Sequence, residues 1–417
     1  MSEPTRPTIP AARPPSLVSG GEPHHASVTP VGGVAEVHEQ QPLVGQDLRT
    51  EELVFNMGPQ HPATHGVLRV VIKSDGEFVQ GLQPHIGNLH RCCEKIGESV
   101  PYYQWIPYVD RMDYLAAMCN EHIACMAVEK AAGIEVPERA EYCRVIVAEV
   151  QRILSHLFAM GVYGLDLGAF TPFLHQFRER EKGLDLLDHI SGGRLLYHYV
   201  RIGGVKRDFT QEWLDELEAF LAAVEQRLPE YNTLLLSNHI FQQRTAGVGV
   251  IDRSACVRWG VTGPALRAAG VDFDVRRDAP YGVYDRFEFA VPHGHSGIAG
   301  VVGDCFQRHW VRTQEVEQSL RIVRQALKQM PQGPVMGKVP KSLKPVAGEV
   351  YVRGENPRGE LAVYMVTQGE DKAWRARCRG PSFSNIAVIT ETAKGTLLAD
   401  LVAAIGSLDI VLGEVDR

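Results

Sequence analysis

The chain has 417 residues, of which 44% are hydrophobic and 22% charged, the usual mixture of a globular protein with a sizeable core. Its net charge of −7, without a strongly basic patch, argues against nucleic acid as a partner. The eight cysteines form no CxxC pair and no zinc or iron–sulfur spacing, so we expect reduced, mostly buried thiols and no metal held by this chain.

The N-terminal residues 1–48 are predicted to be a disordered tail. Their prolines and the near absence of aliphatic periodicity leave too little apolar surface to offset the entropy of ordering. Residues 49–100 are predicted to be β-rich, because apolar runs at 68–72 and 78–82 flank Ser74-Asp75-Gly76-Glu77, a hairpin signal.

From residue 101 to 333 the hydrophobic period becomes helical, with a mixed, glycine-rich insert at 245–290. Residues 345–417 return to a strand-like pattern, clearest at 348–353 and 360–366. The sequence therefore predicts one α+β domain over 49–417, a helical bundle core with small β-rich N- and C-terminal parts. The predicted helices are 112–132, 137–160, 172–191, 209–233 and 304–330.

The stretch 153–177 is long enough for a membrane span, and Asp166 is its only formally charged residue. Glycines at 161, 164 and 168 and the Thr171-Pro172 pair interrupt any single helix. An unpaired Asp166 near the centre of a span would also be costly. We therefore expect two buried helices joined by a turn.

Four distant segments each place a polar group where an apolar pattern is expected. They are His65 in a Gly/Pro-rich loop, the segment Arg111-Met112-Asp113-Tyr114, Asp166, and the charged and apolar C-terminus 409–417. A buried carboxylate must be paired or take up a proton, so Asp166 requires a partner, for which a loop histidine is the natural candidate. Such a His–Asp pair fixes the imidazole tautomer and holds a proton near neutral pH, and Tyr114 adds a neutral donor.

Each residue also has a plainer explanation. His65 can be a capping or packing residue, Tyr114 can belong to the core, and Asp166 can be a satisfied cap or ion-pair member. The residues alone do not show that these groups converge.

The order of several motifs makes the chain similar, over about residues 50–417, to the D-subunit family of NADH–quinone oxidoreductases, the respiratory complex I family. The motifs are Gly58-Pro59-Gln60-His61-Pro62, Pro84-His85-Ile86-Gly87, Arg111-Met112-Asp113-Tyr114, Ala127-Val128-Glu129-Lys130, Leu165-Asp166-Leu167-Gly168-Ala169, Phe177-Arg178-Glu179-Arg180-Glu181, Tyr199-Val200-Arg201-Ile202-Gly203-Gly204-Val205 and Gly413-Glu414-Val415-Asp416-Arg417.

The resemblance implies roles for particular residues. His65 and Tyr114 match the residues that bind the quinone head group, and Asp166 matches the acidic partner of that histidine. Arg111 and Asp113 match residues close to the terminal iron–sulfur cluster, which the neighbouring B subunit carries. Asp409 and Val411 match the C-terminal lining of the same cavity.

The resemblance also implies the surroundings of the chain. The fold would be like that of the nickel–iron hydrogenase large subunit. The complex would be a proton-translocating NADH–quinone oxidoreductase with the B, C, H and I subunits as partners and quinone as substrate. This chain would lie peripherally on the cytoplasmic side of the inner cell membrane, and would bind no cofactor alone, in agreement with its lack of a GxGxxG or P-loop motif.

Two departures from the family pattern matter. Leu196 stands where many members have a histidine near the terminal cluster, and His198 follows two residues later. The segment between Pro334 and Gly348 is also short, as in relatives of the ferredoxin-fed type, which leaves ferredoxin as an alternative electron donor.

Two other functions remain as rivals. A nickel–iron hydrogenase would need four cysteine thiolates in two CxxC-type pairs, but 409–414 contains no cysteine and the adjacent Cys92-Cys93 pair has the wrong spacing. A purely structural component would keep quinone reductase activity when His65 and Tyr114 are replaced.

Overall fold

The computed structural model describes residues 52–417, so the tail predicted for residues 1–48 lies outside the described part of the chain. The strands are β1 Glu52–Met57, β2 Arg69–Asp75, β3 Phe78–His85, β4 Val200–Arg201, β5 Gly204–Val205, β6 Gly348–Asn356, β7 Gly359–Thr367 and β8 Arg375–Arg379. The helices are η1 Pro62–Thr64, α1 Cys93–Gly97, α2 Tyr102–Val109, α3 Ala117–Ala132, α4 Glu138–Asp166, α5 Phe170–Ser191, α6 Gln211–Leu234, α7 His239–Thr245, α8 Arg253–Trp259, α9 Pro264–Ala268, α10 Val275–Asp278, η2 Tyr284–Arg286, α11 Cys305–Gln329, α12 Pro381–Ala387, α13 Ile389–Thr392, α14 Leu398–Ser407 and α15 Leu412–Asp416.

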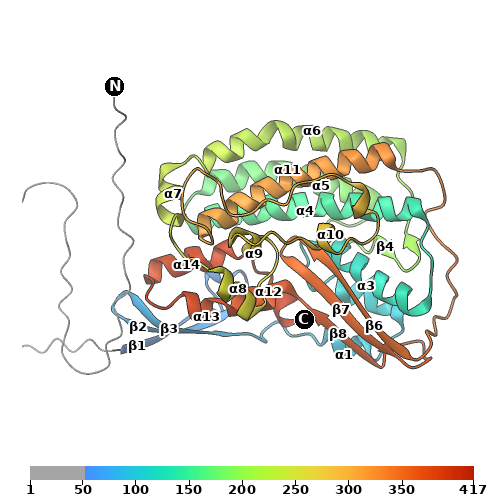
Figure 1. Cartoon of the computed structure of the whole chain (residues 1–417), viewed down its shortest axis with the longest axis horizontal. Helices are drawn as coiled ribbons and strands as arrows, with labels where there is room; N and C mark the ends of the chain where they lie inside the picture. The colour runs from blue at the N-terminus through green and yellow to red at the C-terminus, as the bar shows by residue number, and fades with distance from the viewer. Residues whose placement is uncertain (1–51) are drawn as a thin grey trace, which may run out of the picture.

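The N-terminal part is an antiparallel sheet in the order β1-β2-β3 at one end of the molecule (Figure 1). Alternate residues of β2 and β3, such as Val70, Ile72 and Val79, are fully buried, as expected for strands with one face on the core. The predicted hairpin is confirmed, with Gly76 at φ 57° in its turn. Strand β1 was not predicted.

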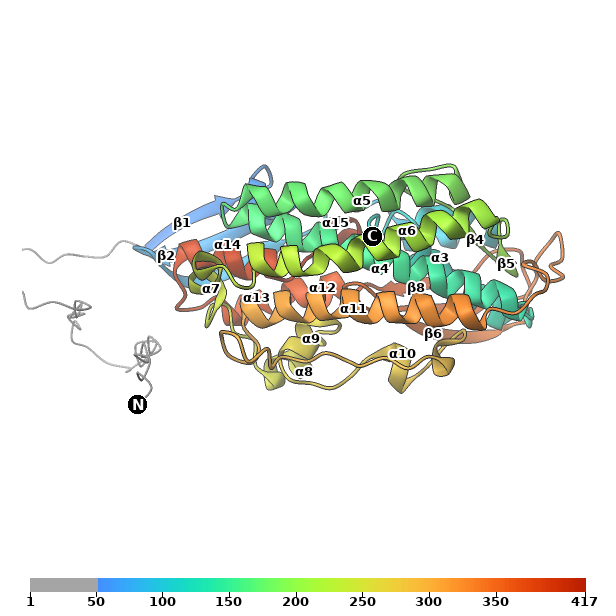
Figure 2. The ribbon, with the colours of Figure 1, turned by 90° about the horizontal axis from the view of Figure 1, so that it is seen from above.

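A layer of long helices, α4, α5, α6 and α11, runs along the molecule with similar axis directions (Figures 1 and 2). Side-chain caps begin two of them: Thr210 accepts from the Trp213 N–H of α6 at 3.2 Å, and Asp304 accepts from the Gln307 N–H of α11 at 2.8 Å. These helices confirm the predicted bundle.

The first predicted helix, 112–132, was wrong at its start. The structure has a separate helix α2, then a turn, and α3 begins only at Ala117. The turn is stabilised by Asn120, whose Nδ2 donates to the carbonyl oxygens of Val109 at 3.1 Å and Asp113 at 3.2 Å. The segment 111–114 therefore lies in a bend between two helices.

The stretch 153–177 does form parts of two helices, but the break lies at 167–169 rather than at the earlier glycines. A Cβ on Gly161 would lie 2.7 Å from Gln176 Oε1, and one on Gly164 would lie 3.3 Å from Leu235 Cδ2. These glycines therefore permit close packing inside a continuous helix. Helix α4 is long and apolar enough to cross a membrane, but 89% of its most apolar stretch is buried inside the protein.

The C-terminal part is only half β-structure. Strands β6, β7 and β8 form an antiparallel sheet, but residues after 380 form the short helices α12 to α15. The expectation of a β-rich region over 345–417 was therefore wrong for this second half. The C-terminus lies in the middle of the molecule, where α15 is fully buried (Figure 1).

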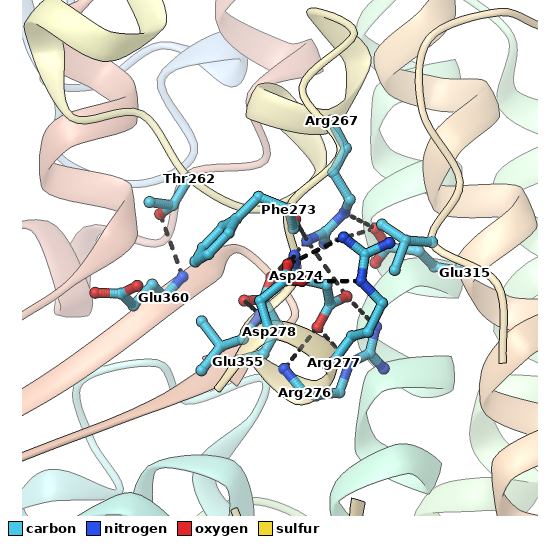
Figure 3. A network of polar contacts seen from close by, with 12 residues as sticks. Thr262, Arg267, Phe273, Asp274, Arg276, Arg277, Asp278, Glu315, Glu355 and Glu360 are labelled. Carbon is cyan, nitrogen blue, oxygen red and sulfur yellow. Dashed lines mark hydrogen bonds and ion pairs between the residues drawn. The ribbon is translucent and has the colours of Figure 1, made fainter. Parts of the chain in front are cut away.

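The mixed insert contains short helices tied to the core by buried ion pairs (Figure 3). Arg267 of α9 donates from Nε to Glu315 of α11 at 2.9 Å and from Nη1 to Glu355 of β6 at 2.8 Å. Arg276 of α10 donates from Nη2 to Asp274 at 2.7 Å. Because these side chains are almost completely buried, each charge depends on its partner, and the network fixes how the insert packs.

Candidate functional site

The loop before β2 holds His65 in a defined position. The His61 imidazole accepts from the Ala63 N–H at 3.2 Å, and the Thr64 hydroxyl donates to the His61 carbonyl oxygen at 2.7 Å. His65 itself has left-handed backbone angles, φ 51° and ψ 34°, which turn the chain out of η1. These bonds restrict the loop and therefore the direction of the His65 side chain.

His65 and Asp166 form a pair, although 101 residues separate them. His65 Nε2 lies 2.9 Å from Asp166 Oδ2, and the side chains are 12% and 5% exposed. Asp166 is the last residue of α4, so a long, buried helix positions its carboxylate. A Cβ on Gly406 of α14 would lie only 2.8 Å from Asp166 Oδ2, so the α14 backbone closes one side of the pair.

Asp113 and Asp409 also come together, through a residue that the sequence analysis missed. The buried Arg358 donates from Nη1 to Asp113 at 3.1 and 3.2 Å, and from Nη2 to Asp409 Oδ1 at 3.1 Å. Its Nη1 also donates to Ser155 Oγ at 2.6 Å. Burial raises the pKa of Asp113 above its usual value, against the lowering effect of the Arg358 charge.

A second buried arginine lies beside this cluster. Arg312 Nε is 3.9 Å from Asp409 Oδ2, too far for a hydrogen bond, and burial lowers the pKa of the Arg312 guanidinium. The sequence does contain a signal for Arg358, because it lies in the turn Asn356-Pro357-Arg358-Gly359 between two apolar strands, where a buried charge would need a partner. Arg312 gave no comparable signal.

Tyr114 and the His65 loop both border helix α15. A Cβ added to Gly66 would lie 3.2 Å from Leu412 Cδ1 of α15. A Cβ added to Gly413 of α15 would lie 3.3 Å from the Tyr114 ring. The Tyr114 hydroxyl finds no hydrogen-bond acceptor among residues 52–417, and burial raises the pKa of Tyr114 above 10. No hydrogen bond joins Tyr114 to His65, and both segments approach α15.

Arg111 and Val411 differ in their exposure and surroundings. Arg111 is exposed and lines a pocket of about 160 Å³ with Arg91, Arg417 and the apolar Met112. Val411 is buried, and its N–H donates to Ser382 Oγ at 3.4 Å. Val411 is therefore not among the residues that line the Arg111 pocket.

An apolar hollow of about 550 Å³ lies beside the His61–His65 loop, between β1 and α14. Its walls include Phe55, Met57, Leu398 and Val402, with His61 at its edge. A groove of similar size, about 530 Å³, lies between α6 and α11 and contains none of the candidate residues.

The cysteines agree with the expectation from sequence. All eight are free thiols, and only Cys92 is exposed.

Comparison with known proteins gives the family. Residues 166–346 and 339–417 match the sequence model of the respiratory-chain NADH dehydrogenase 49 kDa subunit. This chain belongs to that family. A protein of Geobacillus kaustophilus, named as the D subunit of NADH-quinone oxidoreductase, is 50% identical over 370 residues, covering 88% of this chain and 99% of that protein.

Two further relatives carry the same name. The protein of Clostridium beijerinckii is 48% identical over 372 residues, with 89% of this chain and 99% of the relative covered. That of Dehalococcoides mccartyi is 49% identical over 371 residues, with 89% and 100% covered. The 49 kDa subunit family therefore accounts for nearly the whole described chain.

Proposed function

We propose that this chain is the quinone-site D subunit of a proton-translocating NADH–quinone oxidoreductase. The observation that carries the proposal is the His65–Asp166 pair, a hydrogen-bonded imidazole and carboxylate held 2.9 Å apart, on a loop whose His61 lines an apolar hollow. The names of the relatives support the same assignment. In this complex the chain would help electrons to pass from the terminal iron–sulfur cluster of the B subunit to quinone.

The residues fit the chemistry of quinone reduction. Reduction builds negative charge on both carbonyl oxygens, and positioned donors stabilise such charge best in a site that excludes water. Tyr114, with a free hydroxyl and a raised pKa, would donate to one carbonyl, and His65 to the other. Asp166 would orient the His65 imidazole and help to resupply its proton.

The remaining candidate residues would act around this centre. Arg111 and Asp113 would line the gap to the B subunit, whose cluster supplies the electrons. Arg111 supports this role because it lies in an exposed pocket with two other arginines, available to a partner chain. Asp409 and Val411 would line the cavity, although Asp409 is turned mainly toward Arg358.

The assembly proposed includes the B, C, H and I subunits, with attachment to the cytoplasmic face of the inner membrane through the H subunit. The burial of α4 inside the protein supports a peripheral chain rather than a spanning one. The fold would be shared with the hydrogenase large subunit.

A ferredoxin-fed complex is the second candidate, favoured only by the short segment between Pro334 and Gly348. Relatives named for NADH are covered over 99–100% of their length in alignments of 370–372 residues, so they are about as long as the matched part of this chain. The short segment therefore does not separate the two donors. Testing NADH and ferredoxin with the purified complex would do so.

The test of the quinone assignment is Tyr114→Phe in the assembled complex. Loss of one positioned donor should cost about 2–4 kcal/mol of transition-state stabilisation, or about 30- to 900-fold in quinone reduction. Tyr351→Phe, on the exposed face of β6, is the control and should leave the rate unchanged. Reduction of the clusters by NADH should stay normal in both variants. Quinone reduction at the wild-type rate in Tyr114→Phe would contradict the proposal.

A further inference from the structure

Three side chains outside the quinone region bring polar groups close together, and each has at least one buried atom without a hydrogen-bond partner. Asp110 follows the end of α2, Glu121 lies in α3, and His198 lies in the segment between α5 and β4. Both carboxylate oxygens of Asp110, Oε1 of Glu121 and Nδ1 of His198 are buried without a hydrogen-bond partner. One polar side-chain atom from each residue, a carboxylate oxygen or an imidazole nitrogen, lies within 4.8 Å of those of the other two.

The two carboxyl groups have no ion-pair partner among the described residues. Asp110 and Glu121 are both 0% exposed, and neither forms a salt bridge within residues 52–417. Glu121 Oε2 accepts from the backbone N–H groups of Tyr199 at 2.9 Å and Val200 at 2.6 Å, but its Oε1 is left over. Two ionised carboxylates offer only acceptors, so nothing can join them until a proton is added.

The charges around the cluster favour a proton over a metal cation. Arg111, Arg201 and Lys206 act on the His198 imidazole, and Arg111 also acts on Asp110. Their positive charges would repel a divalent ion, for which the chain supplies only three ligands. The other titratable neighbours are two thiols, Cys93 and Cys125, whose pKa values burial raises, so they stay neutral.

We propose that Asp110, Glu121 and His198 form a proton-binding site, in which the two carboxyl groups share one proton and His198 is the route by which that proton exchanges with solvent. This inference does not depend on the quinone assignment.

The titration of the three groups agrees with this geometry. Burial raises the pKa of Asp110 to about 7, and burial together with the Asp110 charge raises the pKa of Glu121 well above its usual value. Burial and the nearby cations lower the pKa of His198. His198 is therefore neutral when the carboxyl pair holds its proton, and because it is only half buried, it alone of the three reaches solvent. Loading or emptying the site changes the charge beside the Arg111 pocket by one unit.

Infrared spectroscopy of the purified, assembled complex tests the shared proton. The wild type should show the carbonyl band of a protonated carboxylic acid that shifts in heavy water and is lost as the pH rises through about 7. Asp110→Asn and Glu121→Gln should each lose this titrating band. Glu349→Gln, an exposed acid on β6, is the control and should keep it. Absence of a band that titrates near neutral pH in the wild type, or its survival in both variants, would overturn the proposal.

Two further measurements separate the parts of the proposal. His198→Leu keeps both carboxyl groups, so the band should remain but its hydrogen–deuterium exchange should be several-fold slower; unchanged exchange would remove His198 from the site. The second measurement is an elemental analysis of the wild-type complex and of the Glu121→Gln variant. Stoichiometric divalent metal in the wild type that this variant loses would show that a cation, not a proton, occupies the cluster.

Discussion

Replacing Arg358 with methionine tests the buried charge cluster most directly. The Arg358 guanidinium is 0% exposed and donates to Asp113, Ser155 and Asp409. Methionine keeps much of the side-chain volume but leaves the carboxylates of Asp113 and Asp409 without their cation. Because removing one partner of a buried ion pair leaves an uncompensated charge, we expect Arg358→Met to lower the free energy of unfolding by about 3–5 kcal/mol near neutral pH.

The size of this loss should depend on pH in a definite direction. Burial already raises the pKa of Asp113, and the Arg358 charge is the largest effect that opposes it. Without Arg358 the pKa of Asp113 in the folded state must rise further, while the unfolded value stays the same. If the pKa of a carboxyl group is higher in the folded state than in the unfolded state, its contribution to stability is fully present below the pKa of the unfolded state. That contribution is lost as the pH rises through the pKa of the folded state. The penalty of the variant should therefore be smaller at about pH 5 than at about pH 8.

Urea denaturation of the purified chain at these two pH values would measure the effect. Arg353→Met is a matched control, since Arg353 lies on the same hairpin in a partly exposed pair with Glu360 at 3.3 Å, which should be worth about 1 kcal/mol or less. Adding Asp113→Asn to Arg358→Met should recover part of the loss. The reasoning fails if Arg358→Met costs no more than Arg353→Met, or if its cost is the same at both pH values.

The remaining predictions concern the His65–Asp166 pair and the state of the chain. Asp166→Asn should keep the shape of the site but slow quinone reduction, because an amide cannot return a proton to the His65 imidazole; a wild-type rate would argue against a role in proton delivery. Gly406→Ala should reduce the rate by up to about 100-fold because its Cβ would stand 2.8 Å from Asp166 Oδ2, whereas Gly81→Ala, with open space around it, should not. Alkaline carbonate washing should release the chain from membranes; retention like that of an integral protein would refute peripheral attachment. Elemental analysis and a visible spectrum of the purified chain should show no metal, flavin or cluster, and stoichiometric iron with labile sulfide would disprove this.

The long helices could be predicted because their apolar period and caps are local. The predicted starts at 209 and 304 lie within two residues of the observed first residues of α6 and α11, Gln211 and Cys305. The end of α4 could not be placed in the same way. Gly161 and Gly164 suggest from the sequence that the helix is interrupted. They lie inside α4 instead, because α5 and Leu235 approach the α4 backbone at these positions. Whether a glycine ends a helix or admits a neighbour depends on tertiary packing.

The short C-terminal helices were missed for a related reason. Helices of five to ten residues, such as α15 and α14, are too short to be stable alone and carry too few turns for a period to be read. In the candidate site, the need of Asp166 for a partner could be inferred from its apolar neighbours. That Arg358 satisfies Asp113 and Asp409 together could not, because the three lie far apart in sequence and each has several possible partners.

Helix α15 shows why the arrangement of the site is a tertiary property. Its Asp416 carboxylate accepts from the N–H groups of Gly87 at 2.8 Å and Leu89 at 2.6 Å, which attaches the helix to the segment after β3. The segment before Tyr114 packs directly against Gly413 of this helix. A Cβ on Gly413 would lie only 2.6 Å from the Met112 carbonyl oxygen, so a larger residue would not fit there. Since a five-residue helix does not hold its own position, these contacts must impose it. The relation between Tyr114 and the His65 loop therefore depends on contacts with a third element, which explains why neither segment predicts that relation by itself.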